Sequence, residues 1–311
     1  MNTENIVKNI SDAYGIDITK MGLLRDGPDN VIWDATSTDD NRYAIRVSKR
    51  EMGDEIAFEA EWIRILQKEG VSVVPIVLTK KGASYSCLDN GSAVTVFNFL
   101  NGKHFSIATD KSLPNHVIET AAEALALLHE VSRRSNMHAS RKRTVFSELE
   151  RVIEHKDLIL EKTPGGKEFI EEVSGMLDWG KARMFDTVLV HNDYRIGNIM
   201  FDDKDNLLAI LDFDWSCMGP AIKDVAHSLA EWSFPDGAEK HDEHVFALFL
   251  EEYNKSSKFP VQRDDTLHRW VALTCLSDAS TFLVDRLLRG EIKQPSYSYM
   301  YKKYEYFLAL K

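Results

Sequence analysis

The chain has 311 residues, of which 44% are hydrophobic and 28% are charged. These proportions are typical of a folded protein and exclude a disordered chain, a collagen or a coiled-coil rod. The formal net charge of −11 disfavours nucleic acid as a partner, because binding phosphates needs many lysine and arginine side chains. No long apolar run and no signal-like start are present, so we expect no membrane contact and a cytoplasmic location.

The N-terminal part of the chain alternates short apolar segments with turn residues, a pattern typical of β-strands. A helix over 5–14 is predicted to precede them. The further predictions are strands over 18–24, 30–35 and 42–47, a helix over 55–69, and strands over 73–78, 84–88 and 93–99. This part of the sequence therefore predicts a small sheet with one inserted helix.

Beyond residue 102 the sequence becomes rich in amphipathic helical patterns. Helices are predicted over 114–131, 148–161 and 166–181, then a β segment over 188–214, and then helix almost to the end. A strand-rich front and a helical back predict two lobes. Their expected bounds are 1–97 and 103–311, joined by a hinge over 98–102.

The β segment contains the spacing His-x-Asp-x-x-x-x-Asn, formed by His191, Asp193 and Asn198, which is that of a kinase catalytic loop. A carboxylate such as Asp193 can accept the proton of a substrate hydroxyl as that hydroxyl attacks the γ-phosphate of ATP. His191 is expected to support the loop by hydrogen bonding. The alternative is that these are turn and cap residues of an ordinary hairpin.

Two apolar stretches, 199–201 and 207–211, flank the turn-forming sequence DDKDN and predict a hairpin. The outer ends of an antiparallel hairpin lie side by side, so Asn198 is expected close to Asp212. An amide oxygen and a carboxylate brought together at a strand end suit Mg²⁺, a hard cation that prefers oxygen ligands.

His191–Asn198, the Asp212-Phe213-Asp214 sequence and Gly219–Ala226 together resemble the aminoglycoside phosphotransferase and choline kinase superfamily. The resemblance extends over nearly the whole chain and is strongest across 188–226. It implies an α+β, protein-kinase-like fold of two lobes. The N-lobe is then an antiparallel sheet with one helix that binds the nucleotide, and the C-lobe is mostly helical.

The resemblance also implies the cofactors and the roles of single residues. ATP and Mg²⁺ are expected, with Asp193 as the catalytic residue, Asn198 and Asp212 as metal ligands, and Asp214 in support. In the N-lobe, Gly27 and Asn30 match the loop that covers the nucleotide, and Arg46 stands where the family places a phosphate-binding lysine.

Three further positions carry expectations from the same resemblance. Glu59 is expected to pair with Arg46, with Glu61 as the rival. Asn98 and Leu100 fall in the interlobe hinge, where backbone groups would hydrogen-bond the adenine edge.

The partner implied is a small-molecule hydroxyl acceptor. Residues 224–252 hold eight acidic residues against one lysine, which would either form a negative pocket for an amine-bearing acceptor or a solvated helix face. An aminoglycoside-like antibiotic or an amino sugar would fit such a pocket. The alternatives are a metabolic kinase for choline, homoserine or a sugar, and, in another class, a nucleotide-binding pseudokinase scaffold.

Overall fold

The computed structural model of this chain describes residues 3–27, 30–49, 53–106, 112–135, 137, 141, 143–295 and 298–310. The chain divides into two compact units. Unit 1 comprises Met1–Lys103 and Leu208–Asp214, and unit 2 comprises His104–Leu207 and Trp215–Lys311. The assignment of a nucleotide lobe, a hinge and an acceptor lobe stays a prediction.

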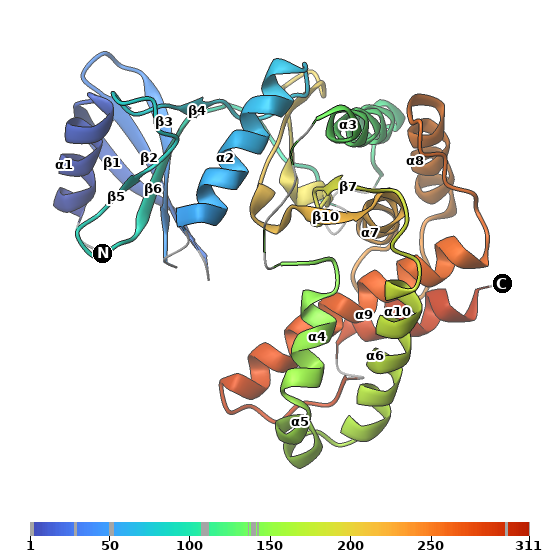
Figure 1. Ribbon diagram of the computed structural model, residues 1–311. Helices are drawn as coiled ribbons and strands as arrows, with labels where there is room; N and C mark the ends of the chain where they lie inside the picture. Colours follow the sequence, from blue (N-terminus) through green and yellow to red (C-terminus); the bar gives the residue numbers. More distant parts are fainter. Residues whose placement is uncertain are drawn as a thin grey trace. The chain divides into compact units, whose positions relative to one another are not determined.

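Unit 1 is built on an antiparallel sheet in the order β1-β2-β3-β6-β4, with β5 also paired to β6 (Figure 1). Its helices are α1 (Thr3–Tyr14) and α2 (Gly53–Lys68), and its strands are β1 (Ile18–Asp26), β2 (Asn30–Ser37), β3 (Arg42–Ser48), β4 (Ile76–Val77), β5 (Ser86–Cys87) and β6 (Ala93–Asn98). The strands and the two helices lie close to the ranges predicted from the sequence.

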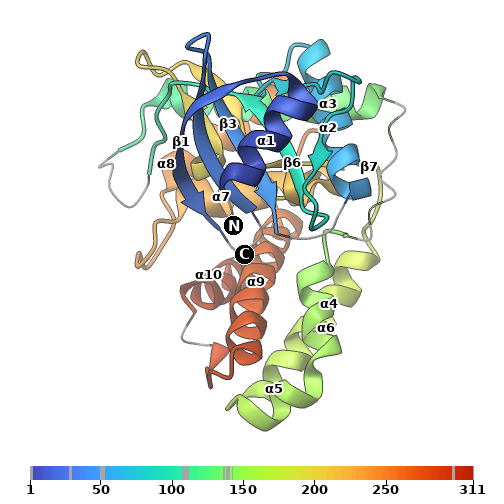
Figure 2. The same ribbon diagram turned by 90° about the vertical axis from the view of Figure 1, so that its left-hand side faces the viewer.

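Alternation along β3 separates an apolar face of this sheet from a charged one. Ile45 and Val47 belong to the buried cluster that α1 completes with Ile6 and Ile10. Arg46, the residue between them, points to the other face because successive strand side chains alternate. Figures 1 and 2 show α1 and α2 on opposite sides of the sheet, so α2 lies on the side of Arg46.

The segment 208–214 belongs to unit 1, although it lies far from the rest of that unit in the sequence. Strand β9 (Leu207–Ile210) runs into it, and the Ile210 N–H donates to the carbonyl oxygen of Ser72 at 2.9 Å. Asp212 then adopts a left-handed backbone with φ of 63°. A non-glycine residue in this region is uncommon, although asparagine and aspartate adopt it more readily than other residues do.

Unit 2 is helical around one long central helix, α9 (Asp265–Leu288). This helix buries residues on almost every side, as a core helix does. Figure 2 shows α4 and α6 beside it, and α10 packs along it. The other helices are α3 (Asn115–Arg134), α4 (Ser147–Glu154), α5 (Lys156–Lys162), α6 (Gly166–Lys181), α7 (Ala221–Ser233), α8 (Glu243–Ser256) and α10 (Tyr299–Ala309).

The remaining elements of unit 2 are short. Strands β7 (Thr187–Val190) and β10 (Cys217–Pro220) pair antiparallel, and β8 (Ile199–Phe201) follows the 3₁₀ turn Ile196–Asn198. The sequence DDKDN forms the predicted turn, in which the Asp202 N–H donates to the Asn206 oxygen at 2.9 Å. Among the described helices, none is both long enough and apolar enough to cross a bilayer.

One helix prediction was wrong in its extent. The helix expected over 148–161 is two helices, α4 and α5, with a break at His155. A straight helix that buries Leu149 and Val152 would bring Lys156 onto the same face one turn later. The break leaves Lys156 exposed and still buries Ile159.

We expect the apolar contacts between α1 and the sheet to contribute much of the stability of unit 1. Ile10 is fully buried, so Ile10→Ala should lower the free energy of unfolding by about 3 kcal/mol through lost burial and a residual cavity. Urea denaturation followed by circular dichroism measures the change. Lys8→Ala, an exposed change on the same helix, is the control. Equal midpoints for the two variants would contradict this packing.

Candidate active site

The predicted catalytic loop leaves the β7–β10 strand pair, where the backbone packs closely. Gly219 lies opposite Val188 in this pair. A Cβ atom at Gly219 would stand 2.5 Å from a methyl carbon of Val145, so only glycine fits without displacing that side chain. The strand therefore delivers the loop that starts at His191 from a tightly packed position.

The carboxylate of Asp224, on α7, holds the start of the loop. Its oxygens accept hydrogen bonds from the backbone N–H of His191 at 2.7 Å and of Asn192 at 2.8 Å. His129 Nε2 lies 3.2 Å from the same carboxylate. Burial alone would raise the pKa of Asp224, but His129, His191 and Lys223 outweigh burial and lower it, so the group is ionised. His129 is a structural histidine, with Tyr253 on its other ring nitrogen.

Asn192 adopts a left-handed conformation with φ of 66°, and the turn of the loop depends on it. The buried ammonium of Lys223 bonds to the Asn192 side-chain oxygen and approaches the backbone oxygen of the same residue at 3.4 Å. His191 Nδ1 faces the backbone N–H of Asp193 at 3.3 Å, so His191 supports the loop.

Asp193 projects from this loop as a partly buried carboxylate. Asn198 Nδ2 donates to its Oδ2 at 2.7 Å and to its backbone oxygen at 2.9 Å, and Arg195 Nε lies 3.4 Å from the same Oδ2. Burial raises the pKa of Asp193, while Arg195, Asn198 and Lys223 oppose the rise. A carboxylate with a raised pKa is a better proton acceptor near neutral pH than a solvated one.

In unit 1, Arg46 joins two carboxylates. Its guanidinium bonds to both oxygens of Glu59 at 2.8 and 2.6 Å and to Asp214 Oδ1 at 2.8 Å. The pairing predicted for Arg46 is therefore present with Glu59, whereas the rival Glu61 pairs with Arg64. Burial would lower the pKa of Arg46, but the charges of Glu59 and Asp214 outweigh burial and raise the pKa above its usual value. The guanidinium is therefore always charged.

The other predicted nucleotide residues lie near this ion pair or at the end of the sheet. Asn30 Nδ2 donates to Asp214 Oδ2 at 2.6 Å. Gly27 donates its N–H to the Asn30 oxygen at 2.9 Å, and a Cβ there would lie 3.3 Å from that same oxygen. Pro28 and Asp29 of this loop are outside the described residues.

The backbone of the predicted hinge is partly engaged in the sheet. The Asn98 N–H donates to the Pro75 oxygen at 3.1 Å, and the Phe99 N–H donates to the Arg42 oxygen at 3.0 Å. These two donors are used inside unit 1. Of the two predicted adenine contacts, Leu100 is therefore the better candidate for a backbone donor.

The two predicted metal ligands, Asn198 and Asp212, belong to different units, so their expected proximity stays a prediction. Their chemistry fits Mg²⁺. Both hydrogen bonds that Asn198 makes to Asp193 use its amide nitrogen, which leaves its amide oxygen for a cation. No three His, Cys, Asp or Glu residues of the described chain form a metal site, and Mg²⁺ normally needs only one or two carboxylates besides substrate phosphates.

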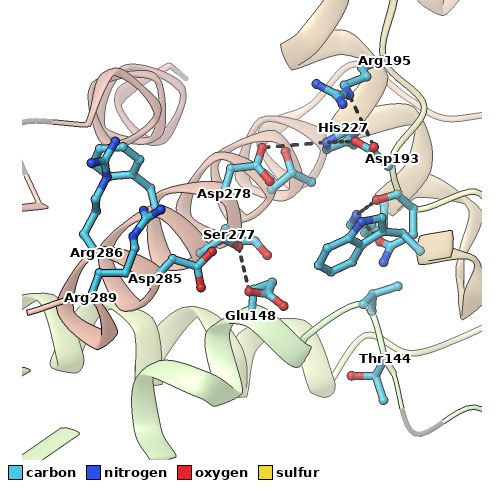
Figure 3. A pocket seen from close by; sticks show the side chains of 17 residues that line it. Thr144, Glu148, Asp193, Arg195, His227, Ser277, Asp278, Asp285, Arg286 and Arg289 are labelled. Atoms are coloured by element: carbon cyan, nitrogen blue, oxygen red, sulfur yellow. Dashed lines mark hydrogen bonds and ion pairs between the residues drawn. The ribbon is translucent and has the colours of Figure 1, made fainter. Parts of the chain in front are cut away.

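A cavity of about 370 Å³ opens beside Asp193, entirely within unit 2 (Figure 3). Asp278, Asp285 and Arg286 of α9 line it, together with Glu148 of α4. At its outer end, Arg151 bonds to Glu148 and Asp285, both at 2.6 Å. The cavity therefore holds carboxylates along its length, with those at the outer end paired to arginine.

The acids that line this cavity are not those that the sequence pattern singled out. None of the eight acidic residues between 224 and 252 lines it. Asp224 holds the loop, Asp242 caps α8, and Glu243 pairs with Arg263. These residues serve helix ends and surface ion pairs, so the solvated-face alternative describes most of them.

Sequence reasoning missed His227 and Asp278, which both line the cavity. A signal existed for Asp278, because it is the only charged residue between Arg269 and Asp285 in an otherwise uncharged stretch of the predicted helix. A lone carboxylate in a core helix needs a partner or a function. His227 follows Asp224 by one helical turn, which places it on the same face of α7.

Comparison with known proteins concerns the family and the fold of the chain. The profile of the family described as "Phosphotransferase enzyme family" matches residues 23–257. A homoserine kinase of Caulobacter vibrioides is 26% identical over 204 residues, which are 63% of this chain and 61% of that protein. The chain thus matches about three fifths of the length of that relative.

Two solved structures resemble the whole chain. Amicoumacin kinase hAmiN, in complex with AMP-PNP, Ca²⁺ and Ami, has a TM-score of 0.76 at 16% identity and covers 99% of this chain and 93% of its own. Choline kinase from Cryptosporidium parvum has a TM-score of 0.68 at 14% identity, with coverages of 99% and 94%. At these identities the likeness concerns the fold, and the predicted α+β, protein-kinase-like fold is confirmed.

We expect the loop to depend on Asp224. Asp224→Ala removes the acceptor of two backbone N–H groups and the partner of His129, and should lower the free energy of unfolding by about 3 kcal/mol. Chemical denaturation measures the change. Asp203→Ala, in an exposed turn, makes the same substitution without those contacts and should change stability by less than about 0.5 kcal/mol. A comparable loss in both variants would rule out the role of Asp224.

Proposed function

Because this chain is a member of the phosphotransferase enzyme family, we propose that it transfers the γ-phosphoryl group of ATP to a hydroxyl group of an amine-bearing small molecule. The observation that carries the proposal is the position of Asp193. It lies on a loop fixed by Asp224 and Asn198 and lines a cavity of about 370 Å³. The acceptor then occupies unit 2, the nucleotide binds unit 1, and 98–102 is the hinge.

Asp193 orients the acceptor hydroxyl and takes its proton as the oxygen attacks the γ-phosphorus. Its raised pKa suits this role, and the hydrogen bond from Asn198 fixes its orientation. Catalysis in phosphoryl transfer is mostly positioning and charge stabilisation. For the acceptor, the principal requirement is therefore a carboxylate held in a fixed position beside its cavity.

On the nucleotide side, Arg46 contacts the phosphates while Glu59 holds its guanidinium. Asn198 and Asp212 would hold Mg²⁺, with Asp214 in support. Mg²⁺ bound there would neutralise negative charge on the transferring phosphoryl group. The cluster of Arg46, Glu59 and Asp214 carries two negative charges against one positive charge, so a bound cation favours the approach of a triphosphate.

The size and charge of the cavity support an amine-bearing acceptor of drug-like size. Pockets of roughly 300–1,000 Å³ bury such ligands. The lining holds four carboxylate residues, Asp193, Asp278, Asp285 and Glu148, and four basic ones, Arg195, Lys223, Arg286 and Arg289. The amine is therefore expected at the inner end, where Asp278 faces the neutral His227. An aminoglycoside-like antibiotic or an amino sugar carries the matching ammonium groups.

A second candidate is a metabolic kinase for a small alcohol such as homoserine or choline. The match to a homoserine kinase over 204 residues favours it. Both candidates use the same base and the same cavity and differ in how much of the cavity the acceptor fills.

The test is ADP release from Mg·ATP across a panel of acceptors. The panel holds aminoglycosides, amino sugars, choline, ethanolamine, homoserine and simple sugars. We expect release that depends on an acceptor and falls by about 10³-fold or more in Asp193→Ala, because the base is removed. ATP binding, measured by thermal shift, should be nearly the same in the variant and the wild type.

Equal loss of ATP binding in Asp193→Ala would contradict the role given to Asp193. Unchanged ATP binding with no acceptor-dependent turnover in the wild type would favour the scaffold over an enzyme.

A further inference from the structure

A histidine lies between two carboxylates at the inner end of the cavity. His227 Nε2 is 3.9 Å from Asp193 Oδ1 and 3.8 Å from Asp278 Oδ2 (Figure 3). Both separations are too long for hydrogen bonds. The three groups therefore face one another without direct hydrogen bonds, on the wall of a cavity open to a ligand.

His227 does not neutralise either carboxylate. Its side chain is only 6% exposed, and its Nδ1 has no hydrogen-bond partner among the residues that the structure describes. Burial lowers the pKa of His227 well below its usual range, and Lys223 lowers it further, so the ring is neutral near pH 7. A buried polar ring left without a partner at a cavity wall is unusual and points to a ligand.

The lysines near Asp278 are engaged elsewhere. The Lys223 ammonium bonds to the side chain of Asn192, and Lys303 lies 3.3 Å from Asp236 and 3.9 Å from Glu231. Burial raises the pKa of Asp278, and the negative charges of Glu231 and Asp193 raise it further. Lys223 and Lys303 oppose this rise, and the Asp278 side chain is 36% exposed where it lines the cavity, so a cation that binds there would lower its pKa.

We infer that Asp278 is the specificity-determining residue of the acceptor site and binds a protonated primary amine of the acceptor. This inference rests on the proposed function, in which Asp193 takes the hydroxyl proton. Both carboxylates lie within 3.9 Å of the same ring nitrogen, so they face the same end of the cavity. The acceptor is then an amino alcohol, and short amino alcohols are the simplest probes of the site.

An ammonium fits this subsite better than other cations do. A primary ammonium has three N–H donors, so it can donate to Asp278 and to a second acceptor at the same time. A quaternary ammonium has no donor, and no metal site is formed by three His, Cys, Asp or Glu residues of the described chain.

The experiment compares three pairs of probes in which an amine replaces a hydroxyl group. The pairs are 2-aminoethanol with ethylene glycol, 3-amino-1-propanol with 1,3-propanediol, and glucosamine with glucose. Calorimetric titration of the full chain with Mg·AMP-PNP present gives each dissociation constant. We expect at least one amine to bind at least tenfold more tightly than its hydroxyl partner, because a hydrogen-bonded charge is gained.

Asp278→Asn should remove that preference, and Asp265→Asn, the same change on an exposed residue of α9, should keep it. For any amino alcohol that is phosphorylated, Asp278→Asn should raise KM at least tenfold and change kcat less than threefold. Choline should bind no better to the wild type than to Asp278→Asn.

Equal binding within all three pairs in the wild type would overturn the inference without any variant. A preference that survives Asp278→Asn would also overturn it. Absence of turnover on every acceptor, together with an amine preference that depends on Asp278, would refute the proposed function and leave the ammonium site in place.

Discussion

The buried carboxylate of Asp224 is the interaction on which the catalytic loop depends. Removing a charge from water is costly, and here two backbone N–H groups and His129 offset the cost. Since those N–H groups belong to the first two residues of the loop, the charge of Asp224 also fixes the turn at Asn192. Asp193 follows directly, so its position beside the cavity is set by a group that never contacts a substrate.

The corresponding buried charge in unit 1 is a cation, the guanidinium of Arg46. Arg46 lies on the face of the sheet opposite the α1 core and is held by Glu59 and Asp214 through three hydrogen bonds. A planar guanidinium can bridge two carboxylates in fixed directions, which a lysine ammonium cannot do in the same way. Arginine at the position where the family places lysine is thus matched to its neighbours, and Asn30 completes the group through Asp214.

Local patterns predicted most of the fold and part of the site. Short apolar segments between turn residues predicted the strands of unit 1, and motif spacing singled out Asp193 and Asn198, which are hydrogen-bonded to each other. The cavity beside Asp193 could not be found in this way, because the packing of α7 against α9 brings His227 to Asp278. Charge density along the chain pointed instead to acids that cap helices or pair on the surface. The break between α4 and α5 was missed because no glycine or proline between 148 and 161 marks it in the sequence.

The central claim is that Asp193, on the loop held by Asp224, transfers a phosphoryl group to the hydroxyl of an acceptor. A ³¹P NMR time course of Mg·ATP with the wild-type chain and the acceptor panel tests this most directly, because it follows the phosphorus atom itself. We expect a new phosphomonoester resonance that grows as the γ-phosphorus signal of ATP declines, and that is absent with Asp193→Asn. A γ-phosphorus signal that stays in ATP with every acceptor, or appears only as inorganic phosphate, would contradict the claim.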